Sequence, residues 1–303
     1  MKDAIISFLK GLWIGGTMTV PGVSGGAMAM IMGIYDRLIY SVSHLFKEFK
    51  KSVLFLAVFA CGGVIGAVLF SKIITFLLNN FGVPFRFFFV GAIAGGIPLM
   101  LKSARVKKFS PACIICPLIG GAIVVGIWLL TKKQFGGGMP SLHDSAVKYI
   151  IFSLIAGVLA AIALVVPGIS LTHIFAMLGI FAPIMAAVGD LDIKALLQYI
   201  PMGLVCVVGT FLIAKILEPA MNNYPTPTYL TIFGFLLGSI PALLFDPADK
   251  GADAAASVSY SDLSAVMWIV SILCAALGFF ALYMLSRFEI KRITETAIEE
   301  AAE

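Results

Sequence analysis

Charge is scarce in this sequence. Asp, Glu, Lys and Arg make up 12% of its 303 residues, whereas soluble domains contain about 25%. Hydrophobic residues make up 60%. A composition this apolar excludes a soluble enzyme, a disordered chain and a disulfide-rich secreted module. The net charge of +5 fits the basic loops of a membrane protein, so no nucleic-acid partner is expected.

Cysteine and histidine are also few, with five and three residues. Cys113 and Cys116 form a CxxC pair, but no second pair and no neighbouring histidine completes a set of metal ligands. All five cysteines lie in apolar segments, where a free thiol packs as a small hydrophobic side chain. We therefore expect no metal and no cofactor.

Long apolar runs predict an all-α polytopic membrane protein. A run of about 20 apolar residues crosses a bilayer as a helix. Six runs fit this length, at 53–78, 85–101, 112–131, 196–217, 229–245 and 264–286.

Two further apolar regions, 4–46 and 149–188, are too long for one crossing, and each contains a Val-Pro-Gly sequence near its middle. Because Pro and Gly end helices, each region is predicted to be a re-entrant-like hairpin with two arms around a break. Whether the arms cross fully is left open. The first region contains Lys10 and continues beyond Pro21, so we interpret it as part of the fold and not as a cleaved signal peptide.

The distribution of basic residues gives an orientation. With the N-terminus in the cytoplasm, thirteen of the 21 Lys and Arg residues fall on the cytoplasmic side, and the opposite loops are rich in Asp. This matches the positive-inside rule, although a loop with Lys132, Lys133 and Lys148 does not fit. We expect both termini on the cytoplasmic side.

The sequence contains an internal repeat. Val20 to Ser24 matches Val166 to Ser170 at an offset of 146 positions, and Asn79-Asn80 matches Asn222-Asn223 at an offset of 143. The predicted repeats are 1–147 and 148–303, each a broken hairpin followed by three crossings. Three crossings are an odd number, so the second repeat is predicted to be inverted relative to the first. Paired broken helices in inverted repeats are typical of transporters, although an old duplication that serves packing alone is the alternative.

Both breaks are candidate anion sites. The first offers Ser24, Gly25 and Gly26, and the second offers Ser170 and Thr172. A helix start carries unpaired N–H donors and a partial positive charge, which suit a phosphate or carboxylate. The alternative is that each Pro-Gly-x-Ser sequence only kinks a helix.

Four basic residues are candidate partners for a bound anion. Lys72 and Lys215 occupy equivalent repeat positions in apolar helices, where a charge is costly and usually functional. Arg86, which precedes three Phe residues, has the group to bind phosphate bidentately, and Arg37 is the fourth candidate. Each of these residues also has a simpler interpretation. The lysines would extend to the membrane surface, Arg86 would anchor a helix at the interface, and Arg37 would form a solvated ion pair with Asp36.

His173 and Glu218 are the candidates for carrying a proton. His173 follows the second break, and Glu218 is the one acidic residue well inside the predicted crossings. A packing role for His173 and an ion pair between Glu218 and Lys215 are the alternatives.

The motifs PGVSGG at 21–26, GIYDRLI at 33–39, PGIS at 167–170 and GFLLGSIP at 234–241 resemble a bacterial and archaeal family. That family was once known only as a domain of unknown function, and its members are now regarded as polyprenyl-phosphate (undecaprenyl-phosphate) translocases. The resemblance covers nearly the whole chain. It implies a lipid flippase in the cytoplasmic (inner) membrane of a prokaryote, whose substrate partner is the lipid carrier phosphate. Its role would be to return that carrier to the cytoplasmic leaflet for reuse in cell-envelope polymer synthesis.

The chain departs from the family pattern at two places. Leu171, Thr172 and His173 follow the second break where Gly-Ser or similar residues are usual, and Ala27 stands where Thr is usual. The second half of the site is therefore expected to hold its ligand differently.

Three other functions remain open. Integral-membrane polyprenyl-pyrophosphate phosphatases also have inverted repeats and a Pro-Gly-x-Ser motif, but no carboxylate lies near the first break and no Arg follows either Ser. A transporter of a small soluble anion would use the same helix ends, and a passive scaffold subunit would need none of them. We expect a transporter and not an enzyme.

Overall fold

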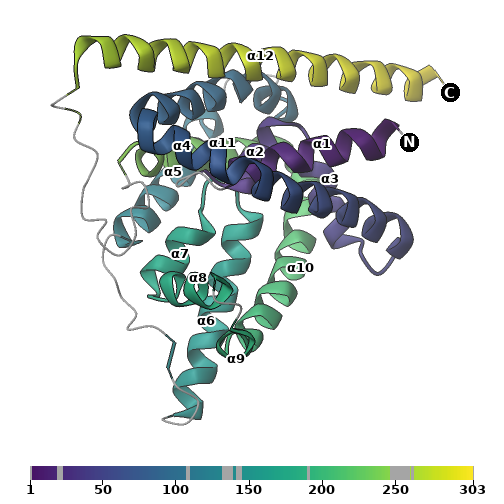
Figure 1. Cartoon of the computed structure of the whole chain (residues 1–303). Helices are drawn as coiled ribbons and strands as arrows, with labels where there is room; N and C mark the ends of the chain where they lie inside the picture. The colour runs from purple at the N-terminus through teal and green to yellow at the C-terminus, as the bar shows by residue number, and fades with distance from the viewer. Residues whose placement is uncertain are drawn as a thin grey trace.

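The computed structural model describes residues 2–18, 23–106, 110–131, 139–140, 145–189, 192–245, 260 and 263–302. These residues are almost entirely helical and include no β-strand (Figure 1). The helices are α1 Lys2–Thr17, α2 Gly25–Ile31, α3 Tyr35–Ser43, α4 Phe49–Ser103, α5 Ala112–Thr131, α6 Ala146–Val165, α7 Leu171–Met177, α8 Phe181–Gly189, α9 Ile193–Leu197, α10 Ile200–Asn223, α11 Pro225–Phe245 and α12 Ala265–Ala302.

Seven helical segments in the described part of the chain are long and apolar enough to cross a membrane. They are Phe49–Phe70, Asn80–Ser103, Ala112–Leu130, Ala146–Val165, Ile200–Asn223, Pro225–Phe245 and Ala265–Phe288. The chain is therefore a polytopic helical membrane protein. Six segments correspond to the six predicted crossings.

The seventh segment is α6, the first arm of the second predicted hairpin. It begins at Ala146, where the Ser145 hydroxyl accepts a hydrogen bond from the Lys148 backbone N–H at 3.4 Å, and it has 20 residues. This arm is thus long enough to cross a bilayer. Its counterpart in the first hairpin, α1, has 16 residues and is shorter than a typical crossing.

Two of the seven segments form the centre of the molecule. Asn80–Ser103 and Pro225–Phe245 bury 61% and 50% of their most apolar stretch inside the protein. The corresponding shares for Ala112–Leu130 and Ile200–Asn223 are only 11%. Apolar side chains on the outer helices, such as Val207, are instead exposed on the surface. A surface of this kind suits the hydrocarbon of a bilayer.

Helix boundaries recur at the offset of the sequence repeat. Helices α2 and α7 begin and end 146 positions apart, and so do α3 and α8. The residue two positions before α3 and α8 is glycine in both cases, with φ 65° at Gly33 and 72° at Gly179. Glycine adopts this left-handed conformation without the steric cost that other residues meet. The chain therefore turns in the same way before α3 and before α8.

A backbone break recurs at the second offset. Phe81 divides α4 with φ −132° and ψ 38°, and Tyr224 separates α10 from α11 with φ −128° and ψ 57°. These residues lie 143 positions apart. The long helix α4 thus corresponds to α10 and α11 together.

Glycines allow close helix packing within each half. A Cβ atom placed on Gly15 of α1 would lie 1.9 Å from the carbonyl oxygen of Gly63 on α4. In the second half, a Cβ atom on Gly157 of α6 would lie 2.7 Å from the carbonyl oxygen of Met202 on α10. Neither contact leaves room for a side chain, so glycine sets the distance between these helices.

The remaining long helices pack across the halves. The second part of α4 packs on α12, where a Cβ atom on Gly91 would lie 1.9 Å from the Ala275 carbonyl oxygen. Helix α11 packs on α5, where a Cβ atom on Gly234 would lie 2.2 Å from the Pro117 carbonyl oxygen. In each half, therefore, one long helix packs against a helix of the other half. In Figure 1, α12 runs along one side of the molecule, next to α4.

Candidate functional site

The two helix breaks are in contact. Helix α1 ends at Thr17 and α2 begins at Gly25, whereas α6 ends at Val165 and α7 begins at Leu171. A Cβ atom on Gly26, beside the first break, would lie 3.2 Å from the Cα atom of Pro167 in the second break. The structure thus brings together two segments that are 146 positions apart in the sequence.

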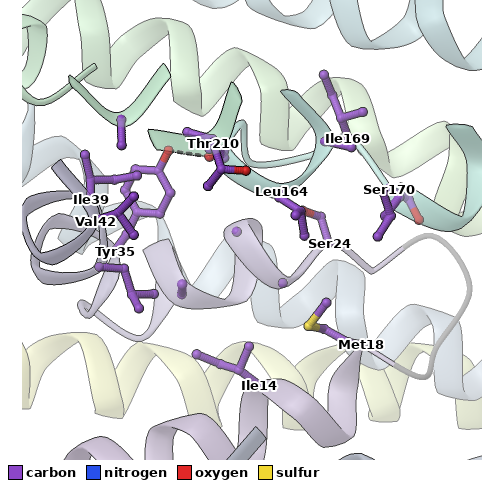
Figure 2. A pocket seen from close by; sticks show the side chains of 18 of the residues that line it. Ile14, Met18, Ser24, Tyr35, Ile39, Val42, Leu164, Ile169, Ser170 and Thr210 are labelled. Carbon is purple, nitrogen blue, oxygen red and sulfur yellow. Dashed lines mark hydrogen bonds between the residues drawn. The ribbon is translucent and has the colours of Figure 1, made fainter. Parts of the chain in front are cut away.

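A cavity of about 310 Å³, here called the central cavity, lies between the breaks. Ser24, Gly25 and Gly26 line it from the first break, and Ser170 lines it from the second (Figure 2). Most other lining residues are apolar and come from α1, α2, α3, α4, α6 and α10; they include Ile14, Met18, Leu38, Ile39, Val42, Phe59, Leu164 and Ala214. The cavity therefore has a few polar groups on an apolar wall.

Two buried hydroxyl groups that face this cavity have no strong hydrogen-bond partner among the described residues. Ser24 is 4% exposed, and Thr210 lines the cavity from α10. The Ser24 hydroxyl oxygen has no partner among the residues that the structure describes, and the Thr210 hydroxyl has only the weak Cys206 thiol, one turn earlier on α10. Ser24 has the extended backbone of an N-cap, with φ −90° and ψ 134°, but its side chain does not cap α2. Burying such a group costs about 1–3 kcal/mol, so two of them in one cavity indicate a place for a ligand.

Tyr35 connects the two halves at the edge of this cavity. Its hydroxyl donates a hydrogen bond to the carbonyl oxygen of Val165, the last residue of α6, at 2.6 Å (Figure 2). The second repeat has Phe181 at the equivalent position, which lacks a hydroxyl group. Neither Tyr35 nor Thr210 is among the site residues predicted from the sequence.

None of the four predicted cationic partners is among the described residues that line the central cavity. Arg86 is 2% exposed, and its Nη1 donates to the carbonyl oxygens of Leu243 and Leu244 at 3.1 Å each. The Arg37 guanidinium lies 4.3 Å from the centre of the Phe55 ring. These contacts give both arginines a partner outside the cavity.

Three predicted residues cannot be assigned contacts. The side chains of Lys72, Thr172 and His173 lie outside the described part of the structure. Their roles stay predictions.

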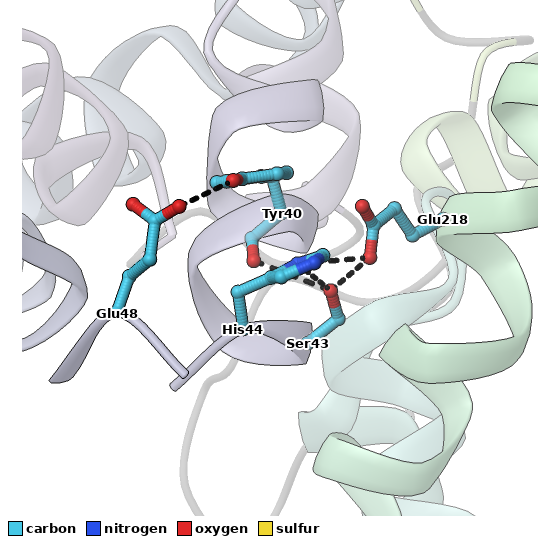
Figure 3. A network of polar contacts seen from close by, with 5 residues as sticks. All are labelled: Tyr40, Ser43, His44, Glu48 and Glu218. Atoms are coloured by element: carbon cyan, nitrogen blue, oxygen red, sulfur yellow. Dashed lines mark hydrogen bonds and ion pairs between the residues drawn. The ribbon is translucent and has the colours of Figure 1, made fainter. Parts of the chain in front are cut away.

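Lys215 and Glu218 line a different cavity, at the ends of α3 and α10. Glu218 Oε2 accepts a hydrogen bond from the Ser43 hydroxyl and lies 3.2 Å from His44 Nδ1 (Figure 3). Its partners are therefore His44 and Ser43 and not Lys215. Ser43 Oγ also lies 2.9 Å from His44 Nδ1. Sequence reasoning missed His44 because its partner is 174 positions away.

No group of three His, Cys, Asp or Glu side chains within the described ranges is arranged to hold a metal ion. The chemistry available at the breaks is that of hydroxyl groups and backbone N–H groups, which donate hydrogen bonds to an anion.

A family model matches most of the chain. Residues 14–251 match the model of a family described as undecaprenyl phosphate translocase-like. The chain belongs to this family. The matched region includes both breaks, both cavities and all but one of the seven membrane-spanning segments.

Two curated relatives are named polyprenyl-phosphate transporters. One, from Vibrio cholerae, is 29% identical over 252 residues, which is 78% of this chain and 76% of the relative. The other, from Staphylococcus aureus, is 29% identical over 289 residues, which is 93% of this chain and 96% of the relative. No solved structure matches the chain.

Proposed function

We propose that this protein transports polyprenyl phosphate between the leaflets of the cytoplasmic membrane, and that the head-group phosphate binds in the central cavity. One observation carries the proposal. Among the described residues, the buried hydroxyl of Ser24 has no partner and that of Thr210 has only the weak Cys206 thiol, and both hydroxyls line a cavity between the two breaks. The names of the two relatives supply the lipid substrate.

The cavity chemistry fits a lipid phosphate. Hydrogen bonds to a charged acceptor contribute about 1.5–3 kcal/mol each, so the phosphate oxygens would satisfy the buried hydroxyls with a net gain. The apolar wall, which includes Ile39, Val42 and Leu164, suits the first isoprenoid units of the tail. A small soluble anion would need no apolar wall of this kind.

The transport mechanism that we propose is a rocking motion of two inverted repeats around the central cavity. Three features that occur in both repeats support this mechanism. They are the matching helix boundaries, the positive φ at Gly33 and Gly179, and the backbone break at Phe81 and Tyr224. In this proposal the two hairpins are re-entrant-like and both termini are cytoplasmic. Transporter sites commonly lie at such repeat interfaces near the bilayer midplane.

A transporter also fits the cavity better than a phosphatase. Hydrolysis of a phosphate ester needs a nucleophile, an acid or base, and cations that stabilise the developing charge. The described lining residues include no carboxylate, histidine, lysine or arginine. Both relatives are named as transporters.

The test is a leaflet-transfer assay with purified protein in liposomes that contain undecaprenyl phosphate. Wild type is compared with Ser24→Ala and Thr210→Val, and released inorganic phosphate is measured in the same samples. Ser153→Ala is the matched control, because Ser153 is also buried with an unpartnered hydroxyl but does not line the central cavity.

We expect transfer without phosphate release, reduced about tenfold or more in the two cavity variants, which corresponds to the loss of one hydrogen bond to a charged group. The Ser153→Ala variant is expected to retain wild-type transfer. Equal transfer in all four proteins would show that the phosphate does not bind in this cavity. Release of inorganic phosphate by wild type would show that the protein is an enzyme.

A further inference from the structure

We propose that a second cavity, here called the outer cavity, binds a phosphate group beside the central cavity, as a second site on its transport path. The proposal rests on the proposed function, because the phosphate is taken to be the polyprenyl head group. The outer cavity has a volume of about 340 Å³ and lies where α3 and α10 end. Figure 3 shows three of its lining residues, Ser43, His44 and Glu218. The described residues that line it are Ser43, His44, Lys47, Lys215, Glu218, Pro219, Asn222 and Asn223.

The charge of the outer cavity suits an anion. Lys47 and Lys215 are exposed, and within the described ranges neither ammonium group lies within 4.0 Å of a carboxylate oxygen. Glu218, the one carboxylate in the lining, is bound by Ser43 and His44. The two lysines are therefore available for a ligand that enters from outside.

The other polar lining residues fit the same ligand. Asn222 and Asn223 carry amide N–H donors at the exposed end of α10. The Lys215 ammonium lies 4.6 Å from the centre of the Phe211 ring, a cation–π contact that holds it near the helix. Ammonium and amide donors around one hollow are the groups that bind phosphate oxygens.

The outer cavity adjoins the central cavity along two helices. On α3, Val42 lines the central cavity and Ser43 lines the outer one. On α10, Ala214 lines the central cavity and Lys215 lines the outer one. Helices α3 and α10 pack against each other although they belong to different halves of the sequence. A head group bound in the outer cavity is thus next to the wall of the central cavity.

Glu218 opposes the two lysines. Its carboxylate joins α10 to the end of α3 through Ser43 and His44, and its negative charge repels a bound phosphate. Removing the charge of Lys215 and removing that of Glu218 should therefore change phosphate affinity in opposite directions. A purely structural role for these residues predicts no such opposition.

The test measures equilibrium binding to the full-length protein in phosphatidylcholine nanodiscs. The probes are radiolabelled inorganic phosphate and a radiolabelled short-chain prenyl phosphate, which separate free phosphate from a lipid head group. The variants are Lys215→Gln, Lys47→Gln and Glu218→Gln, whose amide oxygen still accepts a bond from Ser43. Lys194→Gln is the charge-matched control, because Lys194 is exposed on α9, before the opposite end of α10.

We expect the two lysine variants to bind both probes about 3–10 times more weakly, as for the loss of one exposed charge contact. Glu218→Gln is expected to bind both probes more tightly by a similar factor, and Lys194→Gln to match wild type. Lys215→Arg should restore binding. Each variant is checked for wild-type size and helix content before use.

Three results would overturn the proposal. The first is equal affinity of wild type, Lys215→Gln and Glu218→Gln for both probes. The second is a response to inorganic phosphate alone, which would assign the cavity to free phosphate. The third is absence of binding by wild type. These results differ from a failure of the proposed central site. In that case Ser24→Ala would keep wild-type leaflet transfer, whereas Lys215→Gln would still bind phosphate more weakly.

Discussion

The Tyr35 hydroxyl donates a hydrogen bond of 2.6 Å to the carbonyl oxygen of Val165. Tyr35 begins α3 of the first hairpin, and Val165 ends α6 of the second hairpin, so this bond joins the two halves beside the central cavity. A carbonyl group at the end of a helix has no intrahelical partner, and the tyrosine supplies one.

Replacing Tyr35 with Phe should therefore destabilise the contact between the halves. We expect the free energy of unfolding to fall by about 1–2 kcal/mol, the cost of leaving a buried acceptor unpaired. The measurement is SDS or thermal unfolding of the purified protein in detergent. Tyr224→Phe is the control, since Tyr224 is 68% exposed and should tolerate the change. Equal stability of the two variants would contradict this role.

The turns of both hairpins should require glycine. Gly33 and Gly179 have φ of 65° and 72°, and a left-handed conformation costs other residues about 1–2 kcal/mol. We expect Gly33→Ala and Gly179→Ala each to lower stability by that amount. Gly126→Ala should have the opposite effect, because it lies inside α5 with nothing within 4 Å of a new Cβ atom. Urea or SDS titration of the three variants measures the differences.

The crossed packing of the halves should depend on two more glycines. A Cβ atom on Gly91 would lie 1.9 Å from the Ala275 carbonyl oxygen, and one on Gly234 would lie 2.2 Å from the Pro117 carbonyl oxygen. Backbone atoms cannot move aside locally, so the helices must separate.

We expect Gly91→Ala and Gly234→Ala each to cost about 1–3 kcal/mol in unfolding free energy. Gly82→Ala, also on α4 but with open space around its Cβ position, is expected to cost much less. A similar loss in all three variants would mean that helix separation is not the cause.

Much of the fold follows from hydropathy and the repeat. The six predicted crossings lie on observed helices, because a run of apolar residues long enough for a bilayer has few other structures open to it. The seventh segment was harder to predict. Its first turn includes the charged residue Lys148, so the apolar run in the sequence begins only after that residue. The helix itself begins earlier, directly after the Ser145 cap.

The site was only partly predictable. Ser24, Gly25, Gly26 and Ser170 carry a motif, and the structure brings all four to one cavity. Thr210 carries no signal, because it lies inside a regular helix and its repeat counterpart is Ala67.

Contacts between distant segments were not predictable either. Glu218 pairs with His44 and not with the nearby Lys215, because the packing of α3 on α10 decides which side chains meet. That packing depends on the rotation of each helix about its axis, which the apolar pattern of a membrane helix constrains weakly.

The Ser24 hydroxyl should serve binding at the expense of stability. This hydroxyl is buried without a partner among the described residues, which costs folding free energy. Removing the hydroxyl removes that cost. We expect Ser24→Ala to be as stable as wild type, or more stable by about 1 kcal/mol, while its leaflet transfer falls. Unfolding and transfer are measured on the same preparations. A parallel loss of stability and transfer would make Ser24 a structural residue.

Arg86 provides a test between two roles. The sequence leaves phosphate binding and interfacial anchoring open, whereas in the structure the buried guanidinium donates to the Leu243 and Leu244 carbonyls at the end of α11. Lysine keeps the positive charge but lacks the planar group that reaches both carbonyls.

If the contact with α11 is its main role, Arg86→Lys should lower the unfolding free energy by about 1.5–3 kcal/mol, the range for hydrogen bonds that involve a charged group. Affinity for prenyl phosphate in the folded fraction should then match wild type. Arg287→Lys is the control, since Arg287 is exposed on α12. Wild-type stability with weakened phosphate binding would instead assign Arg86 to the substrate, because only that role needs the bidentate group at a phosphate.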